Sequence, residues 1–596
     1  MKFASIYSNI EEIFPKIYFK TGLNVIFAQV KDPKIMDRDS HNLGKTFLIQ
    51  VIDFALLGDI DKMHPFKVHP DIFADLIFFI EIETVNGQFV TVKRSIKSNP
   101  ISIHVGDQRN LDLKNVPESS WTYPQLSIAK AEKQLNDLLD LEVIIPFNYR
   151  KGLGYFLRRQ SDYDEIFRIS KFQYGPDKYW KPFVALLLGL EQELIVDKYS
   201  LDDDINSLDV KLSVLESEAG SKSDEFDEVR GLLEIRQAAA EKMRIELDAF
   251  SFREIEAQIS ETSVGIIEAE IAVLNEKRYT LDYELQEIEK SLEFEPKFDI
   301  HNIQKVFNEA SVVLPESIIR SYEELVDFNN RMSIGRKERL QTLRGKLVLD
   351  REQIEQRIQT LDNQRQESLR ILQDKQTFKK FKEIQRLLIE REREIGELKQ
   401  RLSQLDKAAS TQRDIDGKKV ELSEKVTSIR KVVNKENQIL TRIRRTFSDC
   451  VERVLRVEAL LSVTVNQNGN LEFNVRTLDR DIAERETSED QGTSYRKVLA
   501  ACFDLSLLMV YSSNKFYRFV YHDGILEGLD NRRKVSWLNQ VREACKNHGI
   551  QYILTVIDSD LPRDDSDQKL LFTEQEIVRY LHDKGDDGRL FRTRTF

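Results

Sequence analysis

The hydrophobic positions in the middle of the chain follow a seven-residue repeat. Between about Leu190 and Leu292 there is no proline, and apolar residues recur at alternating steps of four and three. The same spacing returns between about Leu340 and Leu405. Such a repeat predicts the seam of a coiled coil, because every repeated side chain meets the partner helix on one face. The repeated positions are Leu201, Ile205, Leu208, Leu212, Leu215, Ile267, Ile271, Leu274, Leu281, Leu285, Ile288 and Leu292, then Leu340, Leu343, Leu347, Ile354, Ile358, Leu361, Leu388, Ile395, Leu398, Leu402 and Leu405.

The segment between the two heptad stretches has another character. It contains Pro296 and Pro315 and no clean heptads. We therefore predict an outgoing arm over residues 189–293, an apex or hinge over 294–339 and a returning arm over 340–445, with the arms paired antiparallel. A helical bundle, or pairing between molecules without folding back, would give the same periodicity.

Both ends of the chain read as mixed α/β lobes, over residues 1–188 and 446–596. Strand patterns alternate with helical patterns, which is typical of a parallel or mixed sheet. The expected strands are Lys16–Lys20, Leu23–Val30, Leu76–Thr84, Phe89–Ser95, Leu460–Gln467, Leu471–Thr477, Phe516–Tyr521 and Tyr552–Ile557, and the expected helices are Phe47–Leu57, Ile128–Leu139, Trp180–Leu190, Tyr495–Tyr511 and Arg533–Asn547.

Composition narrows the class of protein. Charged residues make up 32% of the 596, with 23 glycines and 13 prolines, which fits long exposed helices. The net charge of −12 argues against a whole surface built for nucleic acid. The three cysteines have no metal-ligand spacing, and there is no signal-peptide pattern or apolar run long enough to span a bilayer. We expect a cytoplasmic protein with no membrane association.

The stretch Asn42-Leu43-Gly44-Lys45-Thr46 is the strongest chemical motif. It stands between an expected strand and an expected helix, which is the layout of a phosphate-binding loop. In such a loop, backbone N–H groups and a helix N-terminus hold phosphates, lysine reaches the terminal phosphates and threonine binds Mg²⁺. The full pattern has a glycine where this chain has Asp39. An ordinary loop before a helix is the other interpretation.

Two further stretches fit a nucleotide site. The expected strand Arg518–Tyr521 runs into His522-Asp523, and an aspartate ending an apolar strand is the second Mg²⁺-handling element of P-loop ATPases. Gln491-Gly492-Thr493-Ser494 precedes an expected helix, where free N–H groups favour an anion. The alternatives are metal ligands of a phosphohydrolase at His522 and Asp523, an acidic turn at Asp523, and plain N-capping by Ser494.

The order of these parts resembles the SMC, RecN and SbcC group of coiled-coil ABC ATPases, and more narrowly their YydD-like bacterial branch. The resemblance implies an α/β P-loop ABC-type ATPase head, formed from N- and C-terminal lobes, with a long antiparallel coiled coil inserted between them. It implies that Asn42, Gly44, Lys45 and Thr46 hold ATP. It also implies that Thr46, Gln160 and Asp523 handle Mg²⁺, and that Gly492, Thr493 and Ser494 contact the γ-phosphate held by an opposing subunit. Gly528-Leu529-Asp530 matches the loop that contacts the other subunit.

The chain departs from that pattern at Asp39 and at two further places. Gly524 follows Asp523 where the family usually has the water-polarising glutamate, and Glu527 is the nearest substitute. Asp558-Ser559 stands where a switch histidine is expected. These departures favour slow or partner-stimulated ATP hydrolysis, with Lys45, Gln160, Asp523 and Glu527 as the catalytic set. The apex has no CxxC, so a zinc hook is not expected.

The resemblance implies a homodimer through the heads whose ATP-dependent closure controls DNA association or a protein effector, in bacterial defence against phage. Basic residues interleaved with aromatics could hold a phosphate backbone, although a solvated face or internal ion pairs explain them equally well. A nucleotide-binding scaffold with little or no hydrolysis is the alternative function, and a purely structural filament protein is a third. The basic candidates are Arg442, Arg444, Arg445, Arg589, Arg592 and Arg594, with Phe591 and Phe596.

Overall fold

The computed structural model describes residues 1–29, 43–97, 100–173, 175–220, 225–249, 262–293, 316–369, 376–478, 492–563 and 568–594. The chain divides into two compact units. A globular unit contains both chain ends, chiefly Met1–Tyr199 and Glu424–Phe596, and a helical unit contains most of Ser200–Ser423. Mixed α/β structure with long helices is therefore confirmed. The globular unit takes more of each arm than the sequence suggested, because it extends past residue 188 and begins before residue 446.

A five-stranded parallel sheet joins the two ends of the chain. Its strand order is β13-β3-β12-β11-β8, so only β3 and β8 come from the N-terminal part. Hydrogen bonds from Phe3 N to Gln551 Oε1 (2.8 Å) and from Arg518 N to Met1 O (3.0 Å) add to this union. The strands are β3 (Gly22–Gln29), β8 (Leu157–Arg158), β11 (Phe519–Asp523), β12 (Gln551–Ile557) and β13 (Ile577–His582).

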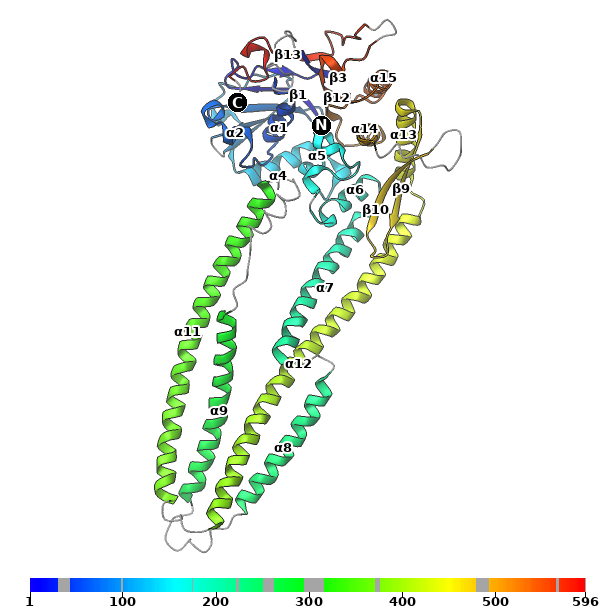
Figure 1. The fold of residues 1–596 in the computed structure, drawn as a ribbon. Coiled ribbons are helices and arrows are strands. Elements are labelled where there is room, and N and C mark those ends of the chain that lie inside the picture. Colours follow the sequence, from blue (N-terminus) through cyan, green and yellow to red (C-terminus); the bar gives the residue numbers. More distant parts are fainter. Residues whose placement is uncertain are drawn as a thin grey trace. The chain divides into compact units, whose positions relative to one another are not determined.

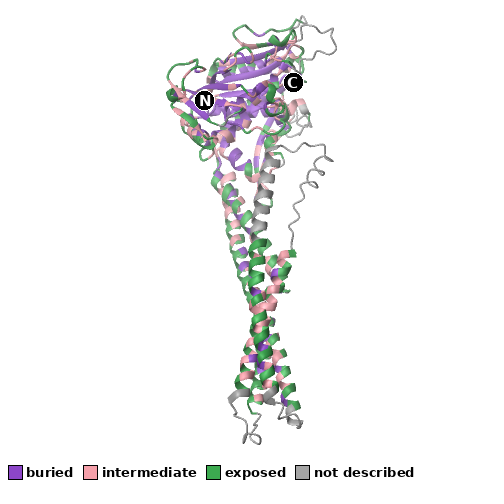
Figure 2. Ribbon diagram, turned by 90° about the vertical axis from the view of Figure 1, so that its left-hand side faces the viewer, coloured by how far each residue is buried: buried purple, intermediate pink, exposed green. Residues whose placement is uncertain are grey.

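A second, antiparallel sheet of six strands belongs to the N-terminal part alone. Helix α1 (Lys45–Ala55) contacts strands of both sheets, so its buried residues, such as Leu48 and Ile52, sit in the core between them. Burial concentrates in this unit, as Figure 2 shows. In order, the sheet consists of β2 (Ile17–Tyr18), β1 (Lys2–Ser8), β4 (Ile77–Glu83), β5 (Phe89–Ser95), β6 (Ile101–Gly106) and β7 (Tyr123–Leu126).

Helices and one hairpin complete the globular unit (Figure 1). Helix α14 contacts β11, and α15 contacts β3 and β12. The sequence predicted most of the longer elements but missed strands β1, β6, β7, β8 and β13 and helices α2, α3 and α5. The elements are α2 (Pro65–Val68), α3 (Pro70–Phe73), α4 (Ile128–Leu139), α5 (Tyr149–Phe156), α6 (Lys181–Leu187), α13 (Gln438–Leu455), β9 (Glu458–Val465), β10 (Leu471–Leu478), α14 (Thr493–Val510) and α15 (Asn531–His548).

In the helical unit the long helices pair antiparallel. Helix α7 (Gln192–Ala219) pairs with α12 (Gln376–Asn434) through Asp204 and Lys418, whose charged atoms are 2.7 Å apart. Helix α8 (Phe226–Asp248) also pairs with α12, and Leu233, Ala240, Leu388 and Ile395 form one buried apolar cluster between them. The apolar seams predicted by the heptads thus lie between helices of one chain.

The remaining two long helices, α9 (Thr262–Glu293) and α11 (Glu316–Leu369), pair with each other. Arg278 and Glu355 are 3.0 Å apart across this pair. Helix α9 also contacts α12, since the Arg393 guanidinium lies 5.7 Å from the ring centre of Tyr279. The two arms therefore do not continue as one straight pair, because α9 pairs with α11 and also contacts α12.

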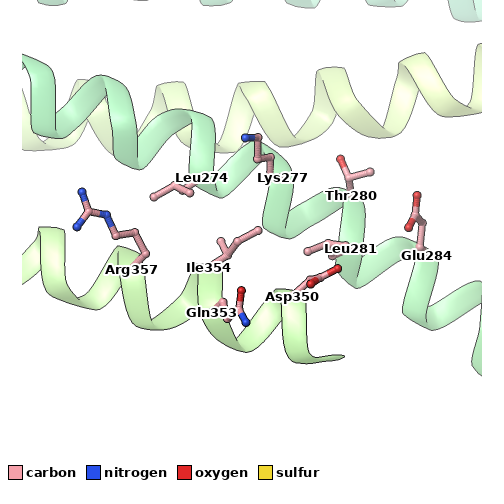
Figure 3. Close-up of a pocket in the computed structure, with 9 residues that line it drawn as sticks. All are labelled: Leu274, Lys277, Thr280, Leu281, Glu284, Asp350, Gln353, Ile354 and Arg357. Atoms are coloured by element: carbon pink, nitrogen blue, oxygen red, sulfur yellow. The ribbon is translucent and has the colours of Figure 1, made fainter. Parts of the chain in front are cut away.

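Only part of the expected apex, residues 294–339, lies within the described residues. Residues 316–339 belong to α11, which runs without a break to Leu369, and residues 294–315 lie outside the described part. Between α9 and α11 a groove of about 520 Å³ opens to solvent, with Leu274, Leu281 and Ile354 on its floor (Figure 3). Its rim carries Lys277, Thr280, Glu284, Asp350, Gln353 and Arg357.

Candidate nucleotide site

The predicted site residues gather at one edge of the parallel sheet. In a parallel sheet the carboxyl ends of all strands meet at the same edge, where ligands usually bind. Strand β3 leads towards Lys45, β11 ends at Asp523, and β8 is followed by Gln160. Strand β12 is followed by Asp560, in a short 3₁₀ helix, Asp558–Asp560. Residues from opposite ends of the sequence thus share one surface.

The described part of the phosphate-loop motif begins at Leu43. Gly44 is the N-cap of α1 and has φ +85°, a left-handed conformation that favours glycine. A side chain there would also approach Leu590, whose Cβ would be 2.9 Å from the added Cβ. No side chain caps this end of α1, Lys45 is buried, and Thr46 is exposed. Asn42 and Asp39 lie outside the described residues.

Asp523 is the site residue with the clearest features of a cation ligand. The side chain is 2% exposed, and its Oδ1 accepts a hydrogen bond from the Thr555 hydroxyl. Its Oδ2 is buried and has no hydrogen-bond partner among the described residues. A buried, unpaired carboxylate oxygen is costly, and a cation bound there, directly or through water, would remove that cost. The site therefore fits Mg²⁺, and Thr555 is a member that the sequence analysis missed.

His522, the neighbour of Asp523, belongs to a different, structural network. Successive side chains of a strand point to opposite faces. His522 is fully buried, with Nδ1 2.7 Å from Tyr552 Oη and Nε2 3.1 Å from Asp504 Oδ2. Burial lowers the pKa of this imidazole. Among the described residues no group of three His, Cys, Asp or Glu side chains could hold a metal ion.

The same network anchors the strand before Gln160. Arg158 donates hydrogen bonds to both carboxylate oxygens of Asp504, at 2.6 and 2.8 Å, and to the carbonyl of Asp162 at 2.6 Å. Both charged groups are fully buried. Desolvation opposes the charge on Arg158, but Asp504 outweighs it and raises the arginine pKa. This ion pair connects β8 to α14. It therefore fixes the end of β8, from which the chain continues to Gln160.

Glu527 is held at the site by two side chains. Its Oε2 accepts a hydrogen bond from Gln160 Nε2 at 3.2 Å and lies 3.5 Å from Lys497 Nζ on α14. The backbone between Asp523 and Glu527 turns at Gly524, which has φ +66°. The chain thus turns tightly directly after Asp523, and Glu527 is the next carboxylate along the sequence.

Asp560 is a further carboxylate that the sequence analysis did not single out. Burial raises its pKa, and the Glu527 carboxylate acts in the same direction. Lys534, Lys45 and Lys497 oppose this shift. Asp560 is thus acted on by the charge of Lys45, the buried lysine of the phosphate-loop motif. Its position just after a strand of the sheet was the signal that could have identified it.

The start of α14 faces the loop after Asp523. Gly492 occupies the N-cap position of α14. Ser494 lies within the first turn of the helix and is therefore not its N-cap. The Ser494 hydroxyl instead donates to Gly528 O at 3.1 Å. Asp530 caps α15 by accepting from Arg533 N at 3.1 Å. Gln491 lies outside the described residues, as does the side chain of Thr493.

The basic residues proposed for DNA are mostly engaged within the chain. Arg442 donates to Val510 O at 3.1 Å, and Arg444 donates to Leu461 O at 2.9 Å. Arg589 pairs with Asp586 at 2.9 Å, and Arg594 pairs with Asp71. The aromatic candidate Phe591 is 2% exposed and packs among other phenylalanines. Two of these arginines thus bind backbone carbonyls and two form ion pairs within the chain.

Comparison with known proteins gives distant similarities. Residues 450–595 match a family described as "Uncharacterised protein conserved in bacteria (DUF2326)". The "Uncharacterized protein YydD" of Bacillus subtilis (strain 168) is 20% identical over 607 residues, covering 98% of this chain and 97% of that protein. No described helix has both the length and the apolar character needed to cross a membrane.

Solved structures with some likeness to the chain include SMC heads. The Smc head domain with a coiled coil and joint from Pyrococcus yayanosii has a TM-score of 0.36 and 14% identity, covering 97% of this chain and 98% of that chain. An SmcHead bound to the C-winged helix domain of ScpA has a TM-score of 0.17 and 14% identity, over 23% of this chain and 39% of that chain. Values this low assign no role to any residue, so function must be argued from the geometry of this chain.

Proposed function

We propose that this chain is an SMC-like ATPase whose two chain ends form one Mg²⁺·ATP-binding head. The observation that carries the proposal is the convergence of Lys45, Gln160 and Asp523 on one sheet edge, with Glu527 hydrogen-bonded to Gln160. A buried lysine beside a helix N-terminus and an unpaired buried carboxylate oxygen are complementary to phosphate and to a divalent cation respectively.

The proposed site assigns separate roles to the phosphate-binding, Mg²⁺-binding and water-activating residues. Gly44, Lys45 and Thr46 hold the phosphates, with Asn42 as a further expected contact, and Lys45 compensates their charge. Thr46, Gln160 and Asp523 hold Mg²⁺, which when bound neutralises charge that develops on the transferred phosphoryl group. Glu527 orients the attacking water and accepts its proton, and the hydrogen bond from Gln160 sets its direction.

The proposal extends to a homodimer of heads. ATP is held between the phosphate loop of one protomer and Gly492, Thr493 and Ser494 of its partner. Contacts made only in the closed dimer shift the equilibrium towards closure, and hydrolysis removes them. The long helices carry this change to a partner. Because several candidate arginines are occupied internally, a protein effector fits better than DNA. Cytoplasmic action in anti-phage defence rests on the resemblance.

The direct test is hydrolysis of Mg²⁺·ATP by the purified chain, with and without DNA. We expect turnover in the wild type and a loss of about 100-fold in Lys45→Ala, since one charge-stabilising group is removed. Lys546→Ala, at an exposed lysine of α15, is the control and should keep wild-type turnover.

The outcomes separate the alternatives. Binding of ATP without turnover, under any partner condition, would favour the nucleotide-binding scaffold. Saturating nucleotide should add about 2.7 kcal/mol at a hundredfold excess over Kd, so an unchanged melting temperature would favour a structural filament protein. Size measurements of Glu527→Gln with Mg²⁺·ATP should show a dimer that separates when nucleotide is removed.

A further inference from the structure

The first turn of α14 holds the loop after Asp523 at two points. The Ser494 hydroxyl donates to Gly528 O at 3.1 Å, and Lys497 Nζ lies 3.5 Å from Glu527 Oε2. Residues three apart on a helix share a face, so both contacts come from the same side of α14. Gly528 has φ +77°, and a Cβ there would lie 3.0 Å from the Ser494 hydroxyl. The loop is therefore fitted to this face of the helix.

Lys497 and Gln160 approach the same oxygen of Glu527. The Gln160 amide donates to Oε2 from one side of the loop, and the ammonium group of Lys497 approaches it from α14. The Glu527 side chain is 43% exposed, whereas that of Lys497 is 19% exposed. A half-exposed glutamate would sample several rotamers without such partners. Lys497 is the more enclosed member and so the better fixed one.

We propose that Lys497 is a positioning residue of the ATPase site, which holds the Glu527 carboxylate against Gln160. The inference rests on the proposed function. Lys497 acts through Glu527 and not by touching nucleotide, so its loss lowers the rate of the chemical step without weakening ATP binding. It also links the helix that begins at Gly492 to the catalytic carboxylate of its own head.

The test compares Lys497→Met with wild type in steady-state hydrolysis of Mg²⁺·ATP. We expect kcat to fall roughly ten-fold, a part of what a general base supplies, with KM changed less than two-fold. Lys497→Arg keeps the charge and should recover most of kcat. Lys546→Met is the control for losing a lysine elsewhere and should match wild type.

A double mutant distinguishes positioning from a direct role. If Lys497 acts only through Glu527, then Lys497→Met should cause no further loss in Glu527→Gln. An equal loss in both backgrounds, or a raised KM with unchanged kcat, would overturn the inference, and so would wild-type kcat in Lys497→Met. Absence of turnover in the wild type itself would overturn the ATPase proposal and this inference together.

Discussion

A Cβ atom placed on Gly524 would lie 2.5 Å from the side-chain nitrogen of Gln160. The side chain of Gln160 therefore takes up the space that any side chain at position 524 would need. The left-handed φ of Gly524 adds a second reason for glycine. Glycine at position 524 thus suits both the turn and the packing of Gln160, and the carboxylate that accepts a hydrogen bond from Gln160 belongs to Glu527.

Gly524→Ala should lower the ATPase rate markedly and the folding stability only modestly. The left-handed backbone costs about 1 kcal/mol, and the displaced Gln160 amide loses its hydrogen bond to Glu527. Gly549→Ala is the matched control, because Gly549 has a similar φ of +62° and open space around its Cβ. We expect both variants to lose similar stability in denaturant unfolding, but only Gly524→Ala to lose ATPase activity. Equal activity in the two would contradict the role given to Gln160.

Asp523→Asn should leave the nucleotide-free protein at least as stable as wild type. Its buried Oδ2 has no partner in the part of the chain that the structure describes, so removing the charge costs no hydrogen bond at that atom. The same change should abolish the rise in melting temperature caused by Mg²⁺·ATP. Thermal unfolding with and without nucleotide measures both effects. A nucleotide-induced shift equal to that of wild type would show that Asp523 does not serve the metal.

Asp504→Asn should have the opposite effect on stability. Asp504 is fully buried, accepts two hydrogen bonds from Arg158 and lies 3.1 Å from His522. Removing one partner of a buried ion pair leaves the other charge uncompensated, at a cost of about 3–5 kcal/mol. Chemical denaturation should show this loss in the absence of nucleotide. A loss below about 1 kcal/mol would mean that the Arg158 charge finds another partner.

His64 should make the protein less stable as the pH falls. Burial lowers its pKa from 6.5 to about 4, and its Nδ1 accepts a hydrogen bond from Phe66 N at 3.2 Å. The unfolded chain binds this proton near pH 6.5 and the folded chain does not, so stability present above pH 6.5 is lost between pH 6.5 and 4. We expect a loss of about 1–2 kcal/mol, allowing for partial exposure.

His64→Asn isolates this effect. Asparagine keeps an acceptor at the N-cap of α2 and does not titrate. Urea unfolding at pH 7 and at pH 4.5 should therefore show a smaller acid loss in the variant than in the wild type. The same acid loss in both proteins would assign the effect to other groups, such as the buried His522, whose pKa is also lowered.

The sequence by itself determined the local elements and the seams between helices. The heptads around Leu388 and Ile395 specify an apolar face on that helix, and that face has to be covered. The helix that begins after Gly44 could be predicted from the glycine that precedes it. The strand that ends at Asp523 could be predicted from its run of apolar residues. These features depend on neighbours in sequence, so the pattern of residues was enough to predict them.

Only the tertiary structure decided which distant residues meet. The parallel sheet inserts β12 and β11 between β3 and β8. That order brings Glu527 beside Gln160 and Lys497, and it brings Asp560 within the electrostatic range of Lys45. The packing of α9 on α12 was equally hidden, since a heptad shows which face is apolar but not which helix covers it. Contacts between segments far apart in sequence depend on how whole layers pack, and a single sequence carries no local signal for that choice.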